Sequence, residues 1–197
     1  MKVRPILFST EMVRQILDGR KTQTRRVIKP QPVDQDDTGW FYQKPVKRDG
    51  IVLMDRIYIR CPYGKVGDRL WVRETWGYSA RLPMSCHSTR DDSTWLAYPD
   101  LRGYKADGLL GYWCWKPSIL MPRWASRIGL EIISLRVERL QKISLEDVEA
   151  EGLKAFDSSK RNGDCFEFIE AWNKINGKRG FPWISNPWVW VIEFKQI

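Results

Sequence analysis

The alternation of apolar and polar residues along the chain predicts several short β-strands. Arg4–Phe8 favours one strand, and Arg69–Trp76 alternates with a period of two. Ile128–Leu140 is rich in β-favouring residues, and in Trp188–Phe194 both alternating sets are mostly apolar, which is typical of a central strand. A sheet with so many apolar faces needs closure or a cover. We therefore expect an α+β fold built on a small mixed β-barrel with peripheral helices.

Capping residues and glycines predict three helices around this sheet. Each begins with a short polar residue, carries apolar residues at helical spacing and ends at a glycine, the residue that best tolerates the left-handed end of a helix. They run from Ser9 or Thr10 to Gly19, from Ser144 to Gly152, and from Asp164 to Gly177.

Two long polar stretches interrupt the predicted strands. Residues at about 32–56 and 78–110 are rich in polar residues and turn formers, so we interpret them as surface insertions into one domain that covers 1–197. Ile51–Arg60, at the end of the first stretch, can form one arm of a hairpin.

The chain is basic and rich in tryptophan. Lys and Arg number 33 against 24 Asp and Glu, which gives a net charge of +9 and favours a nucleic acid or a nucleotide as partner, although solubility alone also explains such a charge. Several of the 11 tryptophans lie beside basic residues. Such pairs suit stacking on bases, but most tryptophans are expected in the core.

Other classes of protein fit the sequence poorly. The four cysteines include no Cys-x-x-Cys pair and His87 is the single histidine, so we expect free thiols, no metal and no cofactor. The chain has no apolar run of membrane-spanning length, and its opening residues lead us to expect no leader peptide. We therefore expect a soluble cytoplasmic protein without a membrane partner.

The basic segment from Gly19 to Arg26 carries the candidate chemistry. Lys21 lies three residues before Thr24, and a neutral lysine amine can activate a hydroxyl as a nucleophile. The strand alternation puts Leu70, Val72 and Glu74 on one face, so this carboxylate should be buried and needs a partner or a raised pKa. We expect the basic segment to form a loop that faces Glu74.

Two sequence blocks resemble the ASCH domains, relatives of the PUA-like β-barrel proteins associated with RNA. Gly19, Lys21, Thr24 and Arg26 match the Gly-x-Lys-x-x-Thr-x-Arg motif, with Arg25 adjacent. Val66–Trp76 is similar to the Gly-Asp turn and the strand ending in a carboxylate. Longer phage and prophage members share further segments and the same insertions, so the resemblance spans most of the chain.

The resemblance implies an amidohydrolase that removes the acyl group from N4-acetylcytidine. Lys21 would be the base, Thr24 the nucleophile, and Glu74 the acid or the orienting carboxylate. Arg26 or Arg25 would bind the carbonyl of the cytosine or a phosphate, and Trp71 or Trp76 would stack on the cytosine ring. Burial or the arginines would lower the pKa of Lys21, whereas an ionised Glu74 would raise it. The substrate would be a small nucleoside, with RNA as a possible partner, and the oligomeric state is unknown.

Other interpretations stay open at this point. The residues could have a structural role alone: Lys21 and Glu74 would form an ion pair, and the Thr24 hydroxyl would bond to the backbone, which together would close one end of the barrel. The same end of the barrel could bind RNA or a nucleotide without catalysis. A metal-assisted ribonuclease and a phage assembly role are further alternatives. The two insertions could also cover or reshape the pocket, which would argue against a free nucleoside as the substrate.

Overall fold

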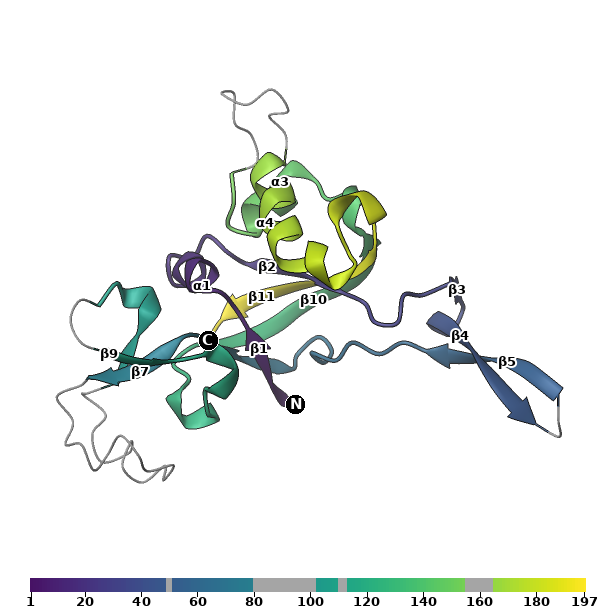
Figure 1. Cartoon of the computed structure of the whole chain (residues 1–197), viewed down its shortest axis with the longest axis horizontal. Helices are drawn as coiled ribbons and strands as arrows, with labels where there is room; N and C mark the ends of the chain where they lie inside the picture. Colours follow the sequence, from purple (N-terminus) through teal and green to yellow (C-terminus); the bar gives the residue numbers. More distant parts are fainter. Residues whose placement is uncertain (49–50, 80–101, 110–112, 155–164) are drawn as a thin grey trace.

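The computed structural model describes residues 1–48, 51–79, 102–109, 113–154 and 165–197 (Figure 1). Its eleven described strands are β1 (Val3–Leu7), β2 (Gln23–Val27), β3 (Asp34–Asp36), β4 (Gly39–Arg48), β5 (Ile51–Tyr58), β6 (Arg69–Arg73), β7 (Trp76–Ser79), β8 (Arg102–Tyr104), β9 (Trp113–Lys116), β10 (Gly129–Arg139) and β11 (Trp188–Gln196). The fold is mixed α+β and rich in strands.

Three α-helices and six short 3₁₀ helices connect these strands in the described part of the chain. They are α1 (Thr10–Leu17), α3 (Leu145–Ala150), α4 (Phe166–Asn176), η3 (Lys105–Asp107), η4 (Ser118–Leu120), η5 (Arg123–Ala125), η6 (Leu140–Lys142), η7 (Gly177–Arg179) and η8 (Trp183–Ser185). None of the described helices is long and apolar enough to cross a membrane.

The largest sheet has five strands in the order β1-β6-β10-β11-β2. β1 pairs with β6 in parallel, and all other neighbours are antiparallel. The sheet is open, because the described residues of β1 and β2 form its two edges without pairing to each other. The predicted barrel is therefore not confirmed. The sheet nevertheless brings its edges together, since Arg26 on β2 donates a hydrogen bond to the Leu7 carbonyl on β1 at 2.5 Å.

Each face of this sheet packs against a different set of helices. On one face, strand residues such as Ile192 form an apolar cluster with Val13 and Ile16 of α1. On the other face, Val191 belongs to a second cluster with residues of α3 and α4. Because successive residues of a strand point to opposite sides of the sheet, neighbouring residues of β11 belong to different clusters.

The first predicted insertion is ordered as a hairpin rather than as an irregular loop. β5 pairs along its whole length with Phe41–Arg48 of β4, and the two strands extend away from the rest of the described chain (Figure 1). This outcome confirms the predicted hairpin arm. Much of the second insertion, predicted at about 78–110, lies outside the described residues, which omit 80–101 and 110–112. Its described ends pair in a small sheet of order β8-β7-β9.

The local signals at the helix ends predict the observed helices well. The Ser9 side chain caps α1, and Gly19 follows it with a φ of 71°. Ser144 and Asp147 form the expected capping box of α3. α4 begins after Cys165, and the predicted cap Asp164 lies outside the described residues.

The expectation of a loop throughout the basic segment was wrong. The second half of that segment is the edge strand β2, which pairs with β11 from Gln23↔Glu193 to Val27↔Val189. Because most of its side chains are polar, the hydrophobic pattern does not reveal this strand, although side chains on both of its faces are buried.

Candidate functional site

Lys21 lies just before β2 and is fixed to the end of α3. Its side chain is buried, with 2% of the residue exposed. The Nζ atom donates hydrogen bonds to the Glu151 Oε2 atom at 2.5 Å and to the Glu151 carbonyl at 2.9 Å. The backbone supports this contact, because Lys21 and Glu151 form an isolated β-bridge and the Thr22 N–H donates to the Ala150 carbonyl.

Burial and the Glu151 carboxylate shift the pKa of Lys21 in opposite directions. Burial lowers the pKa of Lys21, and the Glu151 carboxylate opposes this shift. The nearby charges of Arg26 and Arg25 lower the pKa further, so the net shift is downward. A lysine in such surroundings is closer to the neutral form that a base requires.

Thr24 and Arg26 share the inner face of β2, the face toward α1. Thr24 is buried, with 3% exposed, and pairs with Ile192 of the inner cluster. Within the described residues its hydroxyl makes no hydrogen bond. Arg26 lies over the Phe8 ring at 5.1 Å and the Tyr63 ring at 5.9 Å. No carboxylate among the described residues forms an ion pair with Arg26, and its buried Nε atom has no hydrogen-bond partner there.

Arg25 points to the opposite face, because it is one position away from Thr24 in the strand. Its Nη2 atom donates to Asp147 at 2.7 Å, and Glu151 and Glu138 lie at 3.6 and 3.7 Å. The side chain is 1% exposed. The prediction that Arg25 binds substrate beside Thr24 is thus not supported by its placement under α3.

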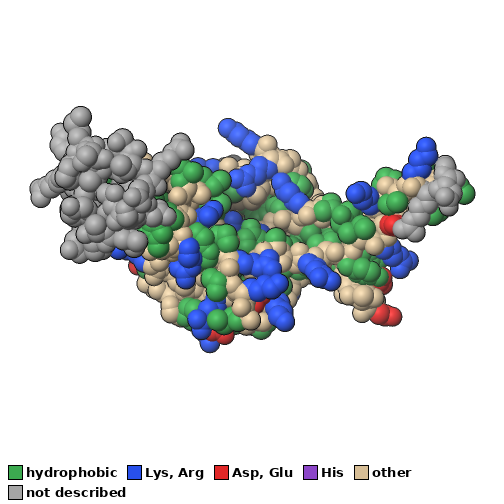
Figure 2. Space-filling view, turned by 90° about the horizontal axis from the view of Figure 1, so that it is seen from below, with side chains coloured by type: hydrophobic (Ala, Val, Ile, Leu, Met, Phe, Trp, Pro, Cys, Tyr) green, Lys and Arg blue, Asp and Glu red, His purple; other side chains and the backbone are tan. Residues whose placement is uncertain are grey.

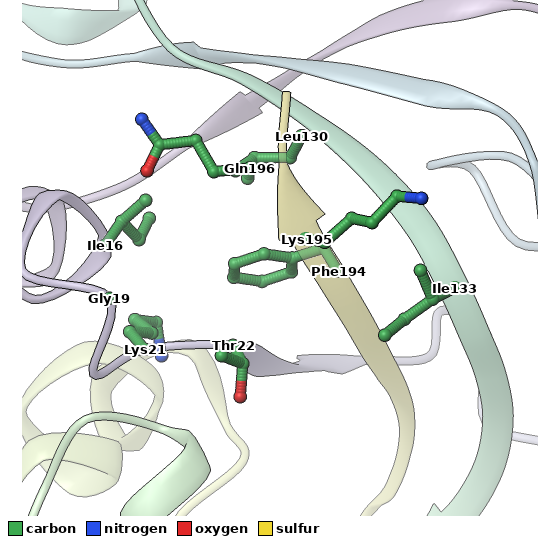
Figure 3. Close-up of a pocket in the computed structure, with 9 residues that line it drawn as sticks. All are labelled: Ile16, Gly19, Lys21, Thr22, Leu130, Ile133, Phe194, Lys195 and Gln196. Atoms are coloured by element: carbon green, nitrogen blue, oxygen red, sulfur yellow. The ribbon is translucent and has the colours of Figure 1, made fainter.

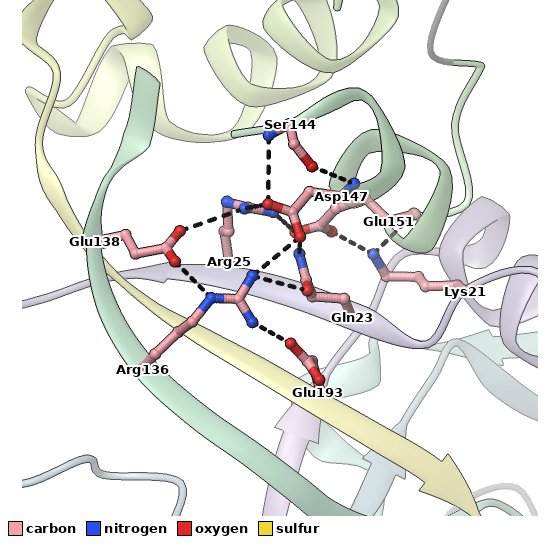
Figure 4. A network of polar contacts seen from close by, with 9 residues as sticks. All are labelled: Lys21, Gln23, Arg25, Arg136, Glu138, Ser144, Asp147, Glu151 and Glu193. Atoms are coloured by element: carbon pink, nitrogen blue, oxygen red, sulfur yellow. Dashed lines mark hydrogen bonds and ion pairs between the residues drawn. The ribbon is translucent and has the colours of Figure 1, made fainter. Parts of the chain in front are cut away.

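A network of charged groups extends from Lys21 across this face (Figure 4). Asp147 accepts hydrogen bonds from Gln23, Arg25 and Arg136, and Arg136 also pairs with Glu138 and Glu193. Burial raises the pKa of Asp147, but the charge of Arg25 and the hydrogen bonds outweigh it, so the net shift is downward. The network binds α3 to β2, β10 and β11.

Glu74 follows β6 and is buried as the alternation predicts, with 1% exposed. Arg127 grips its carboxylate through Nε–Oε1 at 3.0 Å and Nη2–Oε2 at 3.2 Å. The same guanidinium holds Asp107 at 2.7 and 2.9 Å and lies over the Tyr104 ring at 4.0 Å. Burial raises the pKa of Glu74, and Arg127 only partly opposes the shift. The buried carboxylate thus has an ion-pair partner, but this partner is Arg127 and not a residue of the basic segment.

The structure does not form the expected contact between Lys21 and Glu74. Both residues are described, and each pairs with a different partner, Glu151 or Arg127. Phe8 links the two regions. Its ring lies 5.9 Å from Lys21 Nζ, and its N–H donates to the carbonyl of Arg73, which precedes Glu74.

Neither candidate tryptophan offers a free face to a ring. Trp71 is on the side of β6 opposite Leu70 and Val72, again because of strand alternation. The guanidinium groups of Arg73 and Arg123 lie 4.7 and 5.8 Å from its ring. Trp76 is packed in a separate cluster with Met121, and Lys116 lies over its ring. Both tryptophans are buried, as core residues are.

A cavity of about 290 Å³ is lined in part by Lys21 (Figure 3). The ring of Phe194 points into the space between β11 and Ile16 of α1. Lys21 and Thr22 contribute to the lining, whereas Thr24 and Glu74 do not. The lining residues are Ile16, Gly19, Lys21, Thr22, Leu130, Ile133, Phe194, Lys195 and Gln196. This cavity is thus an apolar neighbour of Lys21 rather than a chamber that holds all three candidate residues.

Sequence reasoning missed Glu151, the partner of Lys21, and Arg127, the partner of Glu74, together with Asp107, which Arg127 also holds. Only the predicted buried carboxylate hinted that a cation had to lie nearby. Within the described residues, no three His, Cys, Asp or Glu side chains gather as a metal site would require.

The chain matches no protein-family model, no curated protein and no solved structure. The likeness to ASCH domains therefore rests on the sequence resemblance alone.

Proposed function

We propose that this protein is an amidohydrolase that removes the acyl group from N4-acetylcytidine or a related N4-acylated cytosine nucleoside. One observation carries the proposal. Lys21 and Glu74 are both buried, and burial shifts their pKa values toward neutrality from opposite sides, down for the amine and up for the carboxyl. A base and an acid that work at the same pH need such shifts.

The proposed reaction uses three residues in turn. Thr24 Oγ attacks the acyl carbonyl while its proton passes to the neutral amine of Lys21. The bond between the carbonyl carbon and N4 then breaks, and protonated Glu74 supplies the proton that the leaving amine takes. Water hydrolyses the resulting threonine ester and regenerates the enzyme.

The contacts of the free protein define what substrate binding must change. Lys21 bonds to Glu151 rather than to Thr24, so the first proton transfer needs a rotation of the lysine or an intervening water. Arg127 favours ionised Glu74, so binding must also loosen that grip or exclude more water from the carboxyl. Arg26 is the cation on the same face as Thr24 that can hold the cytosine carbonyl.

The test is the release of cytidine from N4-acetylcytidine by the purified protein. Lys21→Ala and Thr24→Ala should each lower kcat/KM about 1,000-fold, with a double variant little worse than either. Thr24→Ser keeps a hydroxyl and should retain activity, and Thr38→Ala, in the exposed turn before β4, is the matched control. Unchanged activity in Thr24→Ala would exclude Thr24 as the nucleophile, and unchanged substrate with the wild-type protein would exclude the function.

The second candidate is a nucleotide- or RNA-binding module without catalysis. The specific observation in its favour is Arg26, a half-buried guanidinium between two aromatic rings with no carboxylate partner in the described chain. Lys and Arg side chains also outnumber acidic ones on the face shown in Figure 2. Binding of single-stranded RNA that weakens steeply with salt and with Arg26→Ala, without turnover, would favour this candidate.

A further inference from the structure

Glu151 holds the Lys21 side chain through two different atoms. The carboxylate oxygen Oε2 and the backbone carbonyl oxygen each accept one of the three N–H bonds of the ammonium. The β-bridge between the same two residues holds their backbones side by side, so both acceptor oxygens lie within reach of the amine. Within the described residues, Glu151 is the only carboxylate paired with Lys21.

The second oxygen of Glu151 is in an unusual position. Oε1 is buried and accepts no hydrogen bond from any described residue. Its nearest cation is Arg25, whose Nη1 atom lies 3.6 Å away and is itself without a hydrogen bond. The hydrogen bonds that the described residues make to the Glu151 carboxylate therefore come from Lys21 alone.

We propose that Glu151 is the positioning residue of Lys21 and receives the proton that the lysine must lose to act as a base. The proton moves from Lys21 Nζ to Glu151 Oε2, so a charged pair becomes a neutral pair and the net charge of the site does not change. The lone pair on Nζ then accepts the Thr24 hydroxyl proton. This inference rests on the proposed function, and it explains how a lysine sealed from solvent becomes neutral.

The groups around the pair favour this transfer. Arg25 and Arg26, both on β2, disfavour a third positive charge at Lys21. Arg25 is held in place by Asp147 on α3, and Phe8 on the inner side supplies only an aromatic ring. Within the described residues, Glu151 is the only residue that accepts hydrogen bonds from Lys21 Nζ, so it is the only one in position to take the proton.

The direct test is the titration of Lys21, followed by NMR on protein labelled with ¹³C-lysine. Glu151→Gln removes the charge and keeps the shape, so the Lys21 pKa should fall by about one unit or more relative to the wild type. Glu149→Gln changes an exposed carboxylate on the same helix and should leave it unchanged. The same Lys21 titration in both variants would overturn the proposal.

A second variant covers the case in which Glu151→Gln does not fold. Glu151→Asp keeps the charge but withdraws it from Nζ, so it should lower the Lys21 titration midpoint by a smaller amount. An unchanged midpoint in a folded Glu151→Asp protein also contradicts the inference.

The kinetic test separates this inference from the proposed function. In Glu151→Gln, the acid limb of kcat/KM should move to lower pH by the same amount as the Lys21 titration. A structural role alone would lower activity at every pH without moving the limb. Absence of cytidine release by the wild type would refute the proposed function, and the Lys21 titration by NMR would still test whether Glu151 controls the lysine. Activity with an unmoved limb would refute the role of Glu151.

Discussion

The ion pair between Arg127 and Glu74 allows a quantitative prediction. Arg127→Met keeps an unbranched stem but removes every hydrogen bond to a carboxylate that is 1% exposed. Breaking a buried pair by removing one partner costs about 3–5 kcal/mol. Because the Arg127 side chain is itself 28% exposed, we expect a loss near the lower end, about 3 kcal/mol in the free energy of unfolding at neutral pH.

The pH dependence gives this prediction its sign. Burial already raises the folded-state pKa of Glu74 above its ordinary 4.5, and loss of Arg127 raises it further. An acid with a raised folded pKa destabilises the protein at high pH, and this penalty disappears as the pH falls toward the unfolded value. The gap in stability between wild type and variant should therefore narrow between about pH 7 and pH 4.5.

Urea unfolding followed by tryptophan fluorescence measures both effects. Adding Glu74→Gln to Arg127→Met should recover about 1 kcal/mol or more, because a neutral amide is less costly to bury than an unpaired charge. The control is Arg56→Met, since Arg56 forms an ion pair with Asp36 but is 60% exposed, and we expect it to cost about 1 kcal/mol or less. Equal losses in the two single variants, or a loss independent of pH and of Glu74, would refute the reasoning.

Two further predictions concern α3 and its glycine. The pKa of Asp147 is lower in the folded protein than its unfolded value of 3.8, so its carboxylate stabilises the fold above that pH, and this stability is lost as the pH falls through the folded pKa. Asp147→Asn should therefore flatten the acid side of a curve of unfolding free energy against pH, measured by urea unfolding. An unchanged curve would contradict this prediction. Gly152→Ala should cost more than about 1–2 kcal/mol, because φ is +84° and the new Cβ would lie 3.0 Å from Gln15 Cβ, which cannot rotate away as the amide end of that side chain can. Gly180→Ala, with φ +86° and open space, should show the backbone cost alone, and equal melting temperatures of the two variants would exclude a role for Gln15.

Local patterns were enough to predict much of the fold. The caps at Ser9 and Ser144 and the glycines after both helices act within one turn of chain, so the sequence contains all of their interactions. The same holds for the alternation that buries Leu70, Val72 and Glu74 together. A central position for β11 also followed, because both of its faces are apolar.

The interactions between distant parts of the chain could not be predicted. Lys21 and Glu151 are 130 positions apart, and Arg127 is 53 positions from Glu74, so no periodicity connects either pair. The strand β2 escaped prediction for the same reason. Its polar residues are buried because acceptors on α3, β1 and β10 meet them, and a hydrophobic pattern does not encode such acceptors.

These distant contacts change how the basic motif must be tested. Lys21 joins β2 to α3, Arg25 joins β2 to the network beneath α3, and Arg26 bridges the two edges of the open sheet. Each motif cation therefore stabilises the fold whether or not it also acts in catalysis, and a loss of activity after its removal does not by itself show a chemical role. Thr24 forms no such bridge within the described chain, so its hydroxyl can be removed with little structural cost. Activity in Thr24→Ser but not in Thr24→Ala, at equal stability, would therefore distinguish an enzyme from a binding module more cleanly than any substitution of the three cations.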